Sequence, residues 1–451
     1  MDTKTDVNIF LTAKDTKNRL TRQNPINFHE DVNEEERNII NIYDDVAYQE
    51  IIGFGGAFTE AAAFTFYRLP KEKQEEILKA YFDSTVGLNY NFCRTHINSC
   101  DFSLGNYSYA EKPDPELKDF SIDHDKRYLI PLIKSAKEIA GPNLKIFASP
   151  WSPPAWMKTN GQMNGGGKLK NEYKEAWAHY YAKYIKAYSK EGIDICAITV
   201  QNEPKAVQTW DSCVYTAYEE KEFVKNYLGP ILKQEGLENV KIMIWDHNKE
   251  RLFDRAKVAF EDEDASKYIW GAAFHWYSGD HFDAIDATHK KWPNKKLISS
   301  ESCVEKPPQL GSWDVGERYG HDMIGDLKNY TNAWVDWNIL LDEMGGPNHV
   351  GNYCDAPIIA DTRSGILNYE TSYYYMGHFS KYILPGSIRI GNSSFTDELE
   401  TVAFKTPTDN IVLIVMNKND KAIKFNVRYK GMLANYESPA HSILTMTFML
   451  R

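Results

Sequence analysis

The chain has few of the features that mark disulfide-rich, membrane-spanning or nucleic-acid-binding proteins. Its 451 residues include six widely scattered cysteines without a Cys-x-x-Cys pair, which argues against a disulfide framework. No apolar run is long enough to span a bilayer. Acidic residues outnumber basic ones by 63 to 52, a net charge of −11, so nucleic acid and anionic membrane surfaces are poor partners. A neutral small-molecule substrate fits this composition.

The amino-terminal segment also lacks the pattern of a secretory signal. The chain opens Met1-Asp2-Thr3-Lys4-Thr5-Asp6, with no apolar stretch behind a basic start. Together with the scattered cysteines, this opening favours a cytoplasmic location, or secretion if a leader has been trimmed from the sequence.

Short apolar runs separated by helical patterns fill the middle of the chain. The helical patterns include an i, i+4 aromatic stripe from Tyr173 to Tyr188 and the stretch from Lys71 to Phe82. Strands that alternate with helices indicate parallel βαβ units, and eight such units over roughly 300 residues match a (β/α)8 TIM barrel. We therefore predict an α/β fold with this barrel over residues 49–383. The predicted barrel strands are 51–54, 89–97, 145–148, 197–200, 241–245, 268–274, 296–298 and 333–337.

The pattern changes after Pro385-Gly386 to short strands with turns between them. Two amino-terminal segments, 8–12 and 38–42, have no partner in the barrel, so they are expected to join these strands in an accessory antiparallel β-sandwich. The predicted domains are residues 1–48 (amino-terminal sandwich strands), 49–383 (barrel) and 384–451 (carboxy-terminal sandwich). The predicted carboxy-terminal strands are 387–390, 401–405, 411–416, 425–429 and 443–450.

Two glutamates stand where a predicted strand gives way to a loop. Glu203 follows the fourth predicted strand and Glu301 follows the seventh. Catalytic groups of TIM barrels project from the carboxyl ends of the strands, so these carboxylates are expected to face each other across the barrel mouth. A pair of this kind can protonate a glycosidic oxygen and attack the anomeric carbon or activate water. Either glutamate alone would more often be a helix cap or an ion-pair partner, but the pair favours a glycosidase.

Three other patterns are weaker. Gly53-Phe54-Gly55 begins like a dinucleotide-binding fingerprint, but its third glycine is missing. The glycine-rich segment 161–168 differs from a phosphate-binding loop in spacing and in the residue that follows the lysine. No two of His247, His275 and His281 share a ligand-like spacing. We predict neither a cofactor nor a metal ion.

A series of motifs resembles glycoside hydrolase family 30, and within it the bacterial-type members of the glucosylceramidase branch. The resemblance covers nearly the whole chain. Its motifs are IIGFGGA (51–57), SCDFS (99–103), ASPWSPP (148–154), KTN (158–160), NEP (202–204), HWY (275–277), SESC (300–303), DWN (336–338), GGPN (345–348) and GHF (377–379).

The resemblance implies a retaining β-glycosidase that needs no cofactor, with Glu203 as general acid/base and Glu301 as nucleophile. Retaining chemistry requires the two carboxyl groups roughly 5 to 5.5 Å apart. Arg94 and Tyr277 are expected to contact Glu301, and the charge of Glu301 is expected to raise the pKa of Glu203. The residues implied around the first sugar are Arg94, Asp101, Trp151, Asn202, His275, Tyr277, Trp337 and Asn352.

The sequence does not identify the leaving group of the substrate. Gln201 stands where a lysosomal member of this branch carries an acidic residue, and segment 208–213 is expected to form the leaving-group wall. β-Glucosides, glucosylceramide among them, are the favoured substrates. An endo-β-1,6-glucanase, a β-xylosidase or a β-fucosidase on the same site is the alternative, and a non-catalytic carbohydrate-binding protein is the remote one. A closed pocket for one sugar would indicate exo action, and an open cleft would indicate endo action.

Overall fold

The computed structural model describes residues 6–449, so the first five residues of the opening segment lie outside the described part. The chain forms two compact units. The barrel unit comprises residues 55–309 and 333–368, and the sandwich unit comprises residues 6–54, 310–332 and 369–449. The domain bounds given above, which divide the sequence into three consecutive segments, stay predictions.

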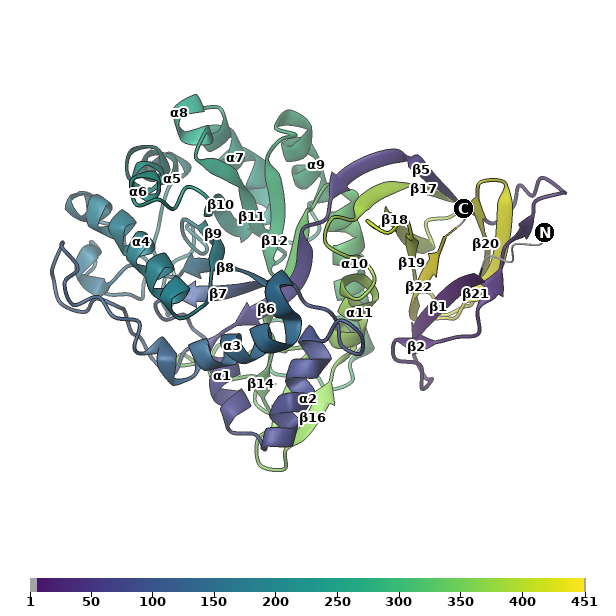
Figure 1. Ribbon diagram of the computed structural model, residues 1–451, viewed down its shortest axis with the longest axis horizontal. Helices are drawn as coiled ribbons and strands as arrows, with labels where there is room; N and C mark the ends of the chain where they lie inside the picture. Colours follow the sequence, from purple (N-terminus) through teal and green to yellow (C-terminus); the bar gives the residue numbers. More distant parts are fainter. Residues whose placement is uncertain (1–5, 450–451) are drawn as a thin grey trace. The chain divides into compact units, whose positions relative to one another are not determined.

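Eight parallel strands, β6 to β13, close into a barrel in sequence order, which confirms the predicted fold (Figure 1). Each lies on one of the predicted apolar runs, because a strand buried on both faces has a continuous apolar sequence. Every residue of β6, β7 and β13 is buried. The barrel strands are β6 (Gly53–Phe58), β7 (Phe92–Ile97), β8 (Lys145–Pro150), β9 (Ile195–Thr199), β10 (Lys241–Asn248), β11 (Ile269–His275), β12 (Lys296–Glu301) and β13 (Ala333–Asn338).

The helices of the barrel unit include both predicted helical stretches. The aromatic stripe lies on α4, where Trp177, Tyr181, Tyr184 and Tyr188 are fully buried. Gly192, with a φ of 80°, takes the left-handed conformation that commonly ends a helix. The helices are α1 (Glu60–Tyr67), α2 (Lys71–Phe82), α3 (Leu129–Ala140), α4 (Lys174–Lys190), α5 (Ala217–Phe223), α6 (Gly229–Gln234), α7 (Leu252–Phe260), α8 (Glu263–Ser266) and α9 (Phe282–Lys291).

Shorter elements complete the barrel unit. A π-helical turn, Val224–Leu228, joins α5 to α6. A small sheet comprises β14 (Leu341–Asp342), β15 (Ile358–Asp361) and β16 (Ile366–Tyr369). Single 3-10 turns occur at Asp125–Arg127, Gly141–Asn143, Ala155–Met157, Asn171–Tyr173 and Lys249–Arg251. Among residues 6–449, none of the helices combines the length and the apolar character needed to cross a membrane.

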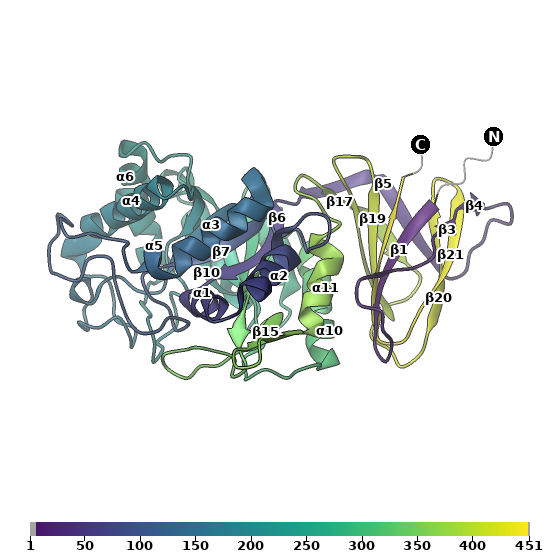
Figure 2. The ribbon, with the colours of Figure 1, turned by 60° about the horizontal axis from the view of Figure 1, so that its bottom comes forward.

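The sandwich unit joins the amino- and carboxy-terminal segments in one sheet that folds into two layers, with β19 in one layer and β20 and β21 in the other (Figure 2). As predicted, the first segment pairs antiparallel, β1 with β22 and β5 with β17. The pair β5–β20 is parallel, so the sandwich is not antiparallel throughout. The sequence did not predict β21, because its alternating polar residues, MLANYES, give no apolar run.

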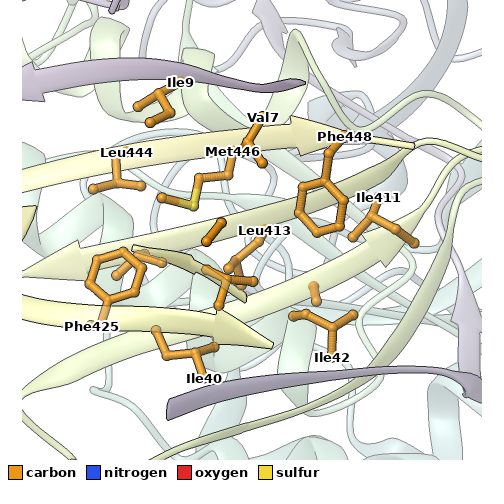
Figure 3. Packing of buried hydrophobic residues seen from close by; sticks show 14 of the residues in the cluster. Val7, Ile9, Ile40, Ile42, Ile411, Leu413, Phe425, Leu444, Met446 and Phe448 are labelled. Carbon is orange, nitrogen blue, oxygen red and sulfur yellow. The ribbon is translucent and has the colours of Figure 1, made fainter. Parts of the chain in front are cut away.

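The core of the sandwich consists of the inward-facing residues of both layers (Figure 3). Alternate residues of β20 are buried, as a strand with one covered face requires. Ile40, Leu413, Phe425 and Leu444 meet in this core. The unit also contains α10 (Trp313–Lys328) and α11 (Thr371–Ser380). Its strands are β1 (Asp6–Ala13), β2 (Thr21–Arg22), β3 (Ile26–Asn27), β4 (His29–Glu30), β5 (Ile39–Glu50), β17 (Ile388–Ser394), β18 (Leu399–Lys405), β19 (Ile411–Asn417), β20 (Ile423–Tyr429), β21 (Met432–Ser438) and β22 (Ser442–Phe448).

Candidate active site

The carboxyl ends of two barrel strands bring the predicted glutamates together. Glu301 is the last residue of β12, and Glu203 lies just beyond the end of β9. One carboxylate oxygen of Glu203 lies within 4.8 Å of one of Glu301. Inverting glycosidases hold their carboxyl groups roughly 6.5 to 9.5 Å apart to admit a water molecule. The shorter separation therefore fits direct attack by one carboxylate.

The backbone is strained just beyond β9 and within the neighbouring strand β10. Glu203, Trp245 and Asp246 all have positive φ angles, of 48°, 73° and 55°. Such conformations are costly for residues other than glycine and cluster at functional sites. The Glu203 N–H donates to the Asp246 carbonyl at 2.9 Å, so the ends of β9 and β10 are tied to each other. The resulting turn lets Asn202 and Glu203 line one cavity, although neighbouring residues of a regular strand point to opposite faces.

A fully buried arginine holds the nucleophile candidate. Arg94, on β7, donates from Nη1 to Glu301 Oε2 at 2.5 Å and from Nη2 to Asp246 Oδ2 at 2.8 Å. It also donates to Asn202 Oδ1 at 2.8 Å and to Ser149 Oγ at 3.1 Å. The expected pairing of Arg94 with Glu301 is thus present. The guanidinium fixes one oxygen of Glu301. It also fixes the side chain of Asn202, the residue that precedes the acid candidate Glu203.

Asp246 is a central residue that the sequence reasoning missed. It accepts hydrogen bonds from Arg94, Ser300 Oγ (2.6 Å) and Thr199 Oγ1 (2.7 Å), and it contacts His275 Nε2 at 3.0 Å. Burial acts to raise its pKa, but the charge of Arg94 and these hydrogen bonds outweigh burial and hold the pKa of Asp246 well below its usual range. Its signal was available, because it follows a predicted strand in the same way as the two glutamates.

The acid candidate forms a proton-sharing pair with a buried histidine. His275 Nδ1 lies 3.3 Å from Glu203 Oε1 and 4.0 Å from Glu301 Oε1. Burial acts to lower the pKa of His275, but the charges of Glu301 and Asp246 and the contact with Glu203 raise it to about 9. Burial acts to raise the pKa of Glu203, yet the hydrogen bond from His275 and the charge of His247 leave it lowered. The expected rise in the pKa of Glu203 is therefore wrong for the free protein, where the shared proton rests on His275.

A further carboxyl group, that of Asp101, lines the same cavity. Asp101 accepts hydrogen bonds from Asn348 Nδ2 and Asn352 Nδ2, both at 3.1 Å. Burial raises the pKa of Asp101 to about 7, with the charge of Glu301 acting in the same direction. Near neutral pH this carboxyl group can therefore be either a donor or an acceptor toward a hydroxyl.

The cavity above these residues has a volume of about 250 Å³. Trp151 and Trp337 stack on its wall with ring centroids 5.1 Å apart, and Tyr277 Oη donates to Glu301 Oε1 at 2.9 Å. Arg94 and His275 lie behind the lining rather than in it. The predicted residues that do line the cavity are Asp101, Trp151, Asn202, Glu203, Tyr277, Glu301, Trp337 and Asn352. Further lining residues are Phe102, Gln208, Trp210, His247, Asn248, Cys303, Glu305 and Cys354.

The arrangement suits proton transfer and nucleophilic attack better than metal binding. Glu203, His275 and Glu301 offer ligand atoms within 4.8 Å of one another. A metal-binding imidazole must be neutral, however, and the pKa of His275 is raised to about 9. The guanidinium of Arg94 at Glu301 adds a positive charge that would repel a cation. The residues present therefore do not fit a resident metal ion.

Asp101→Asn should reduce the loss of stability that we expect for the wild type between pH 5 and pH 8. A carboxyl group whose pKa is about 7 when folded and roughly 3.9 when unfolded stabilises the fold at low pH and loses that contribution as the pH rises through 7. Asparagine imitates the protonated form and does not titrate. Urea midpoints at the two pH values measure the effect. An equal drop in wild type and variant would contradict the raised pKa.

Known proteins resemble the chain in both units. Residues 51–383 match the glycosyl hydrolase family 30 TIM-barrel domain, and residues 386–446 match the family 30 β-sandwich domain. Lysosomal acid glucosylceramidase of Mus musculus is 36% identical over 90% of this chain and 82% of its own length. An endo-1,6-β-D-glucanase of Aspergillus fumigatus is 28% identical over 88% of this chain and 84% of its own.

A solved structure agrees with these sequence comparisons. SrfJ from Salmonella typhimurium has a TM-score of 0.96 and 39% identity, over 99% of this chain and 100% of that one. The barrel and the sandwich thus both match domains of one family of glycosyl hydrolases. The chain belongs to glycosyl hydrolase family 30 and is a glycoside hydrolase.

Proposed function

We propose that the protein is a retaining β-glucosidase that releases one glucose unit at a time from the non-reducing end of its substrate. The observation that carries this proposal is the pair of carboxylates within 4.8 Å of each other at a cavity of about 250 Å³. Pockets for drug-sized ligands measure roughly 300 to 1,000 Å³, so this cavity suits one sugar ring rather than a chain.

Glu301 has the surroundings of a nucleophile. One of its oxygens accepts from Arg94 and the other from Tyr277, which fixes the plane of the carboxylate. Attack on the anomeric carbon forms a glycosyl ester on the face opposite the leaving group. Asn202, held by Arg94, is placed to bond the sugar 2-hydroxyl, a contact that strengthens as the oxocarbenium-like transition state develops.

Glu203 passes the proton to the leaving oxygen. In the free protein that proton is bound to His275, whose Nδ1 lies 3.3 Å from Glu203 Oε1, so the two side chains titrate as one coupled pair. Esterification of Glu301 removes the charge that contributes most to raising the pKa of His275. The pair has by then given its proton to the leaving group and takes up another less readily, so Glu203 stays ionised and serves as the base that activates water in the second step.

The leaving-group side of the cavity is lined by polar side chains. Glu203 marks this side, because the acid must lie beside the scissile oxygen. His247 Nε2 lies 3.7 Å from Glu203 Oε1, and Asn248 also lines the cavity. A leaving group with its own hydroxyl or amide can form hydrogen bonds there, so such a group fits best.

Such groups occur next to the glycosidic oxygen in both ceramide and a second sugar. The greater similarity to the glucosylceramidase of Mus musculus, 36% against 28% for the glucanase, supports glucosylceramide as the favoured substrate.

Hydrolysis of a substrate panel should show β-glucose as the first product. The panel is 4-nitrophenyl β-glucoside, β-xyloside and β-fucoside, with glucosylceramide in mixed micelles and a β-1,6-glucan, and proton NMR identifies the anomer before it equilibrates in solution. Glucosides should be the best substrates, because the pocket holds one sugar. Release of α-glucose would exclude double displacement. Oligosaccharides from the glucan, without action on the glucosides, would assign endo action instead.

A further inference from the structure

Two thiols face the sugar cavity and take no part in the proposed mechanism. Cys303 lies just after β12, and Cys354 lies in the segment between β14 and β15. Both line the cavity, and each is only 3% exposed. Neither is in a disulfide. They share an apolar cluster with Trp151 and Trp337, the two rings of the cavity wall.

The two cysteine segments run side by side. The Asp355 N–H donates to the Val304 carbonyl at 3.0 Å, one residue beyond each cysteine, and the Cys354 N–H donates to the Gly345 carbonyl at 3.1 Å. Hydrogen-bonded neighbours of this kind are compatible with the roughly 4.4 to 6.8 Å between Cα atoms that a disulfide requires. A hydrogen bond between the two thiols is the largest of the causes that raise the pKa of Cys303, followed by burial. The thiols are therefore in contact.

One of these thiols touches the group that orients the nucleophile. Cys303 Sγ lies 3.4 Å from Tyr277 Oη, which donates to Glu301 Oε1 at 2.9 Å. The Cys303 carbonyl accepts a hydrogen bond from Trp276 Nε1 at 3.0 Å, which fixes the backbone of Cys303. Movement of the sulfur toward Cys354 would therefore remove a contact from Tyr277 and change the hydrogen bond to Glu301.

We propose that Cys303 and Cys354 form a redox-sensitive dithiol that a hydroperoxide closes to a disulfide, with loss of hydrolysis. Either thiol can make the first attack, and the steps are the same in kind when Cys354 attacks. Its thiolate takes one peroxide oxygen, the O–O bond breaks, and a sulfenic acid and water result. The Cys303 sulfur then displaces that oxygen as a second water and forms the S–S bond. Two thiols and one hydrogen peroxide give one disulfide and two waters, and the two electrons pass from sulfur to peroxide.

Peroxide treatment of the full chain tests this proposal. We expect hydrogen peroxide, followed by catalase, to lower 4-nitrophenyl β-glucoside hydrolysis at least about tenfold, to reduce the intact mass by about 2 Da and to link the peptides of Cys303 and Cys354. Dithiothreitol should restore the mass and the activity. Inactivation without that linked peptide, or the linked peptide without a change in activity, would overturn the proposal. The mass readout holds whether or not this glucoside is a substrate.

Two variants separate the dithiol from other oxidation events. Cys354→Val keeps the position apolar and removes one thiol, so it should form no linked peptide and retain a larger share of its own starting activity. Cys196→Ser removes the half-buried thiol on β9 and should stay as sensitive as wild type. Saturating glucose should slow the linkage in wild type, because it fills the cavity that both thiols line. Equal reversible loss in Cys354→Val and wild type would contradict the proposal.

Discussion

Glu301→Ala is expected to lower kcat/KM for 4-nitrophenyl β-glucoside at least about a thousandfold, or ~4 kcal/mol of transition-state stabilisation. The variant loses the atom that forms the glycosyl ester, while Arg94 and Tyr277 are left without the carboxylate that they hold. Steady-state kinetics measure the loss. Glu172→Ala, at an exposed position before α4, is the control for expression and folding, and it should keep wild-type rates.

Azide should partly rescue the Glu301 variant and should reveal which face the carboxylate serves. The small anion fits the space left by the side chain and attacks the anomeric carbon opposite the leaving group, so the product should be the α-glucosyl azide. A β-glucosyl azide from this variant would place the nucleophile on the wrong face. Retention of more than about a tenth of wild-type activity would remove Glu301 from the chemistry altogether.

Glu203→Ala should divide substrates by their leaving groups. Octyl β-glucoside and glucosylceramide need a proton on the departing oxygen, so their hydrolysis should fall by about 10²- to 10⁴-fold. 4-Nitrophenolate leaves without a proton, so its first release should stay fast. The second step should then be slow, because no base activates water. Stopped-flow measurements should therefore show a burst of 4-nitrophenolate followed by slow turnover.

The product of azide rescue provides an independent test of the Glu203 role. In this variant the anion attacks the glycosyl ester on Glu301 from the side where Glu203 stood, so the β-glucosyl azide is expected. Equal losses on octyl and 4-nitrophenyl glucosides, without a burst, would mean that Glu203 does not act as the general acid.

The barrel could be predicted because its strands have a strong local signal. Strands buried on both faces give apolar runs, and the helix α4 gives a stripe of buried aromatic residues. The strand β21 could not be predicted in this way, because it alternates polar with apolar residues and has no run to detect. Its place depends on pairing with β20, which is a property of the folded sheet.

The site was predicted in its residues more than in its electrostatics. Placement at strand ends singled out Glu203 and Glu301, and the same placement would have found Asp246. What the sequence could not show is that His275 bridges Asp246 and Glu203, because that contact depends on the strained backbone at Glu203 beyond β9 and at Asp246 within β10. The direction of the Glu203 pKa shift follows from this bridge, so the expectation drawn from Glu301 alone was wrong.

The contact between Cys303 and Cys354 also lies beyond the sequence pattern. The two residues come from separate loops and have no characteristic spacing, so nothing in the sequence pairs them.

Trapping of the covalent intermediate tests the central claim most directly. A 2-deoxy-2-fluoro-β-glucoside with a dinitrophenyl leaving group should react quickly with Glu301, and the resulting glycosyl ester should hydrolyse slowly. The fluorine destabilises the oxocarbenium-like transition state of both steps, and the good leaving group offsets this effect only in the first step. Peptide mapping by mass spectrometry should then find one fluoroglucosyl group, on Glu301. A label on Glu203 or another carboxylate, or turnover of the reagent without any label, would contradict the account.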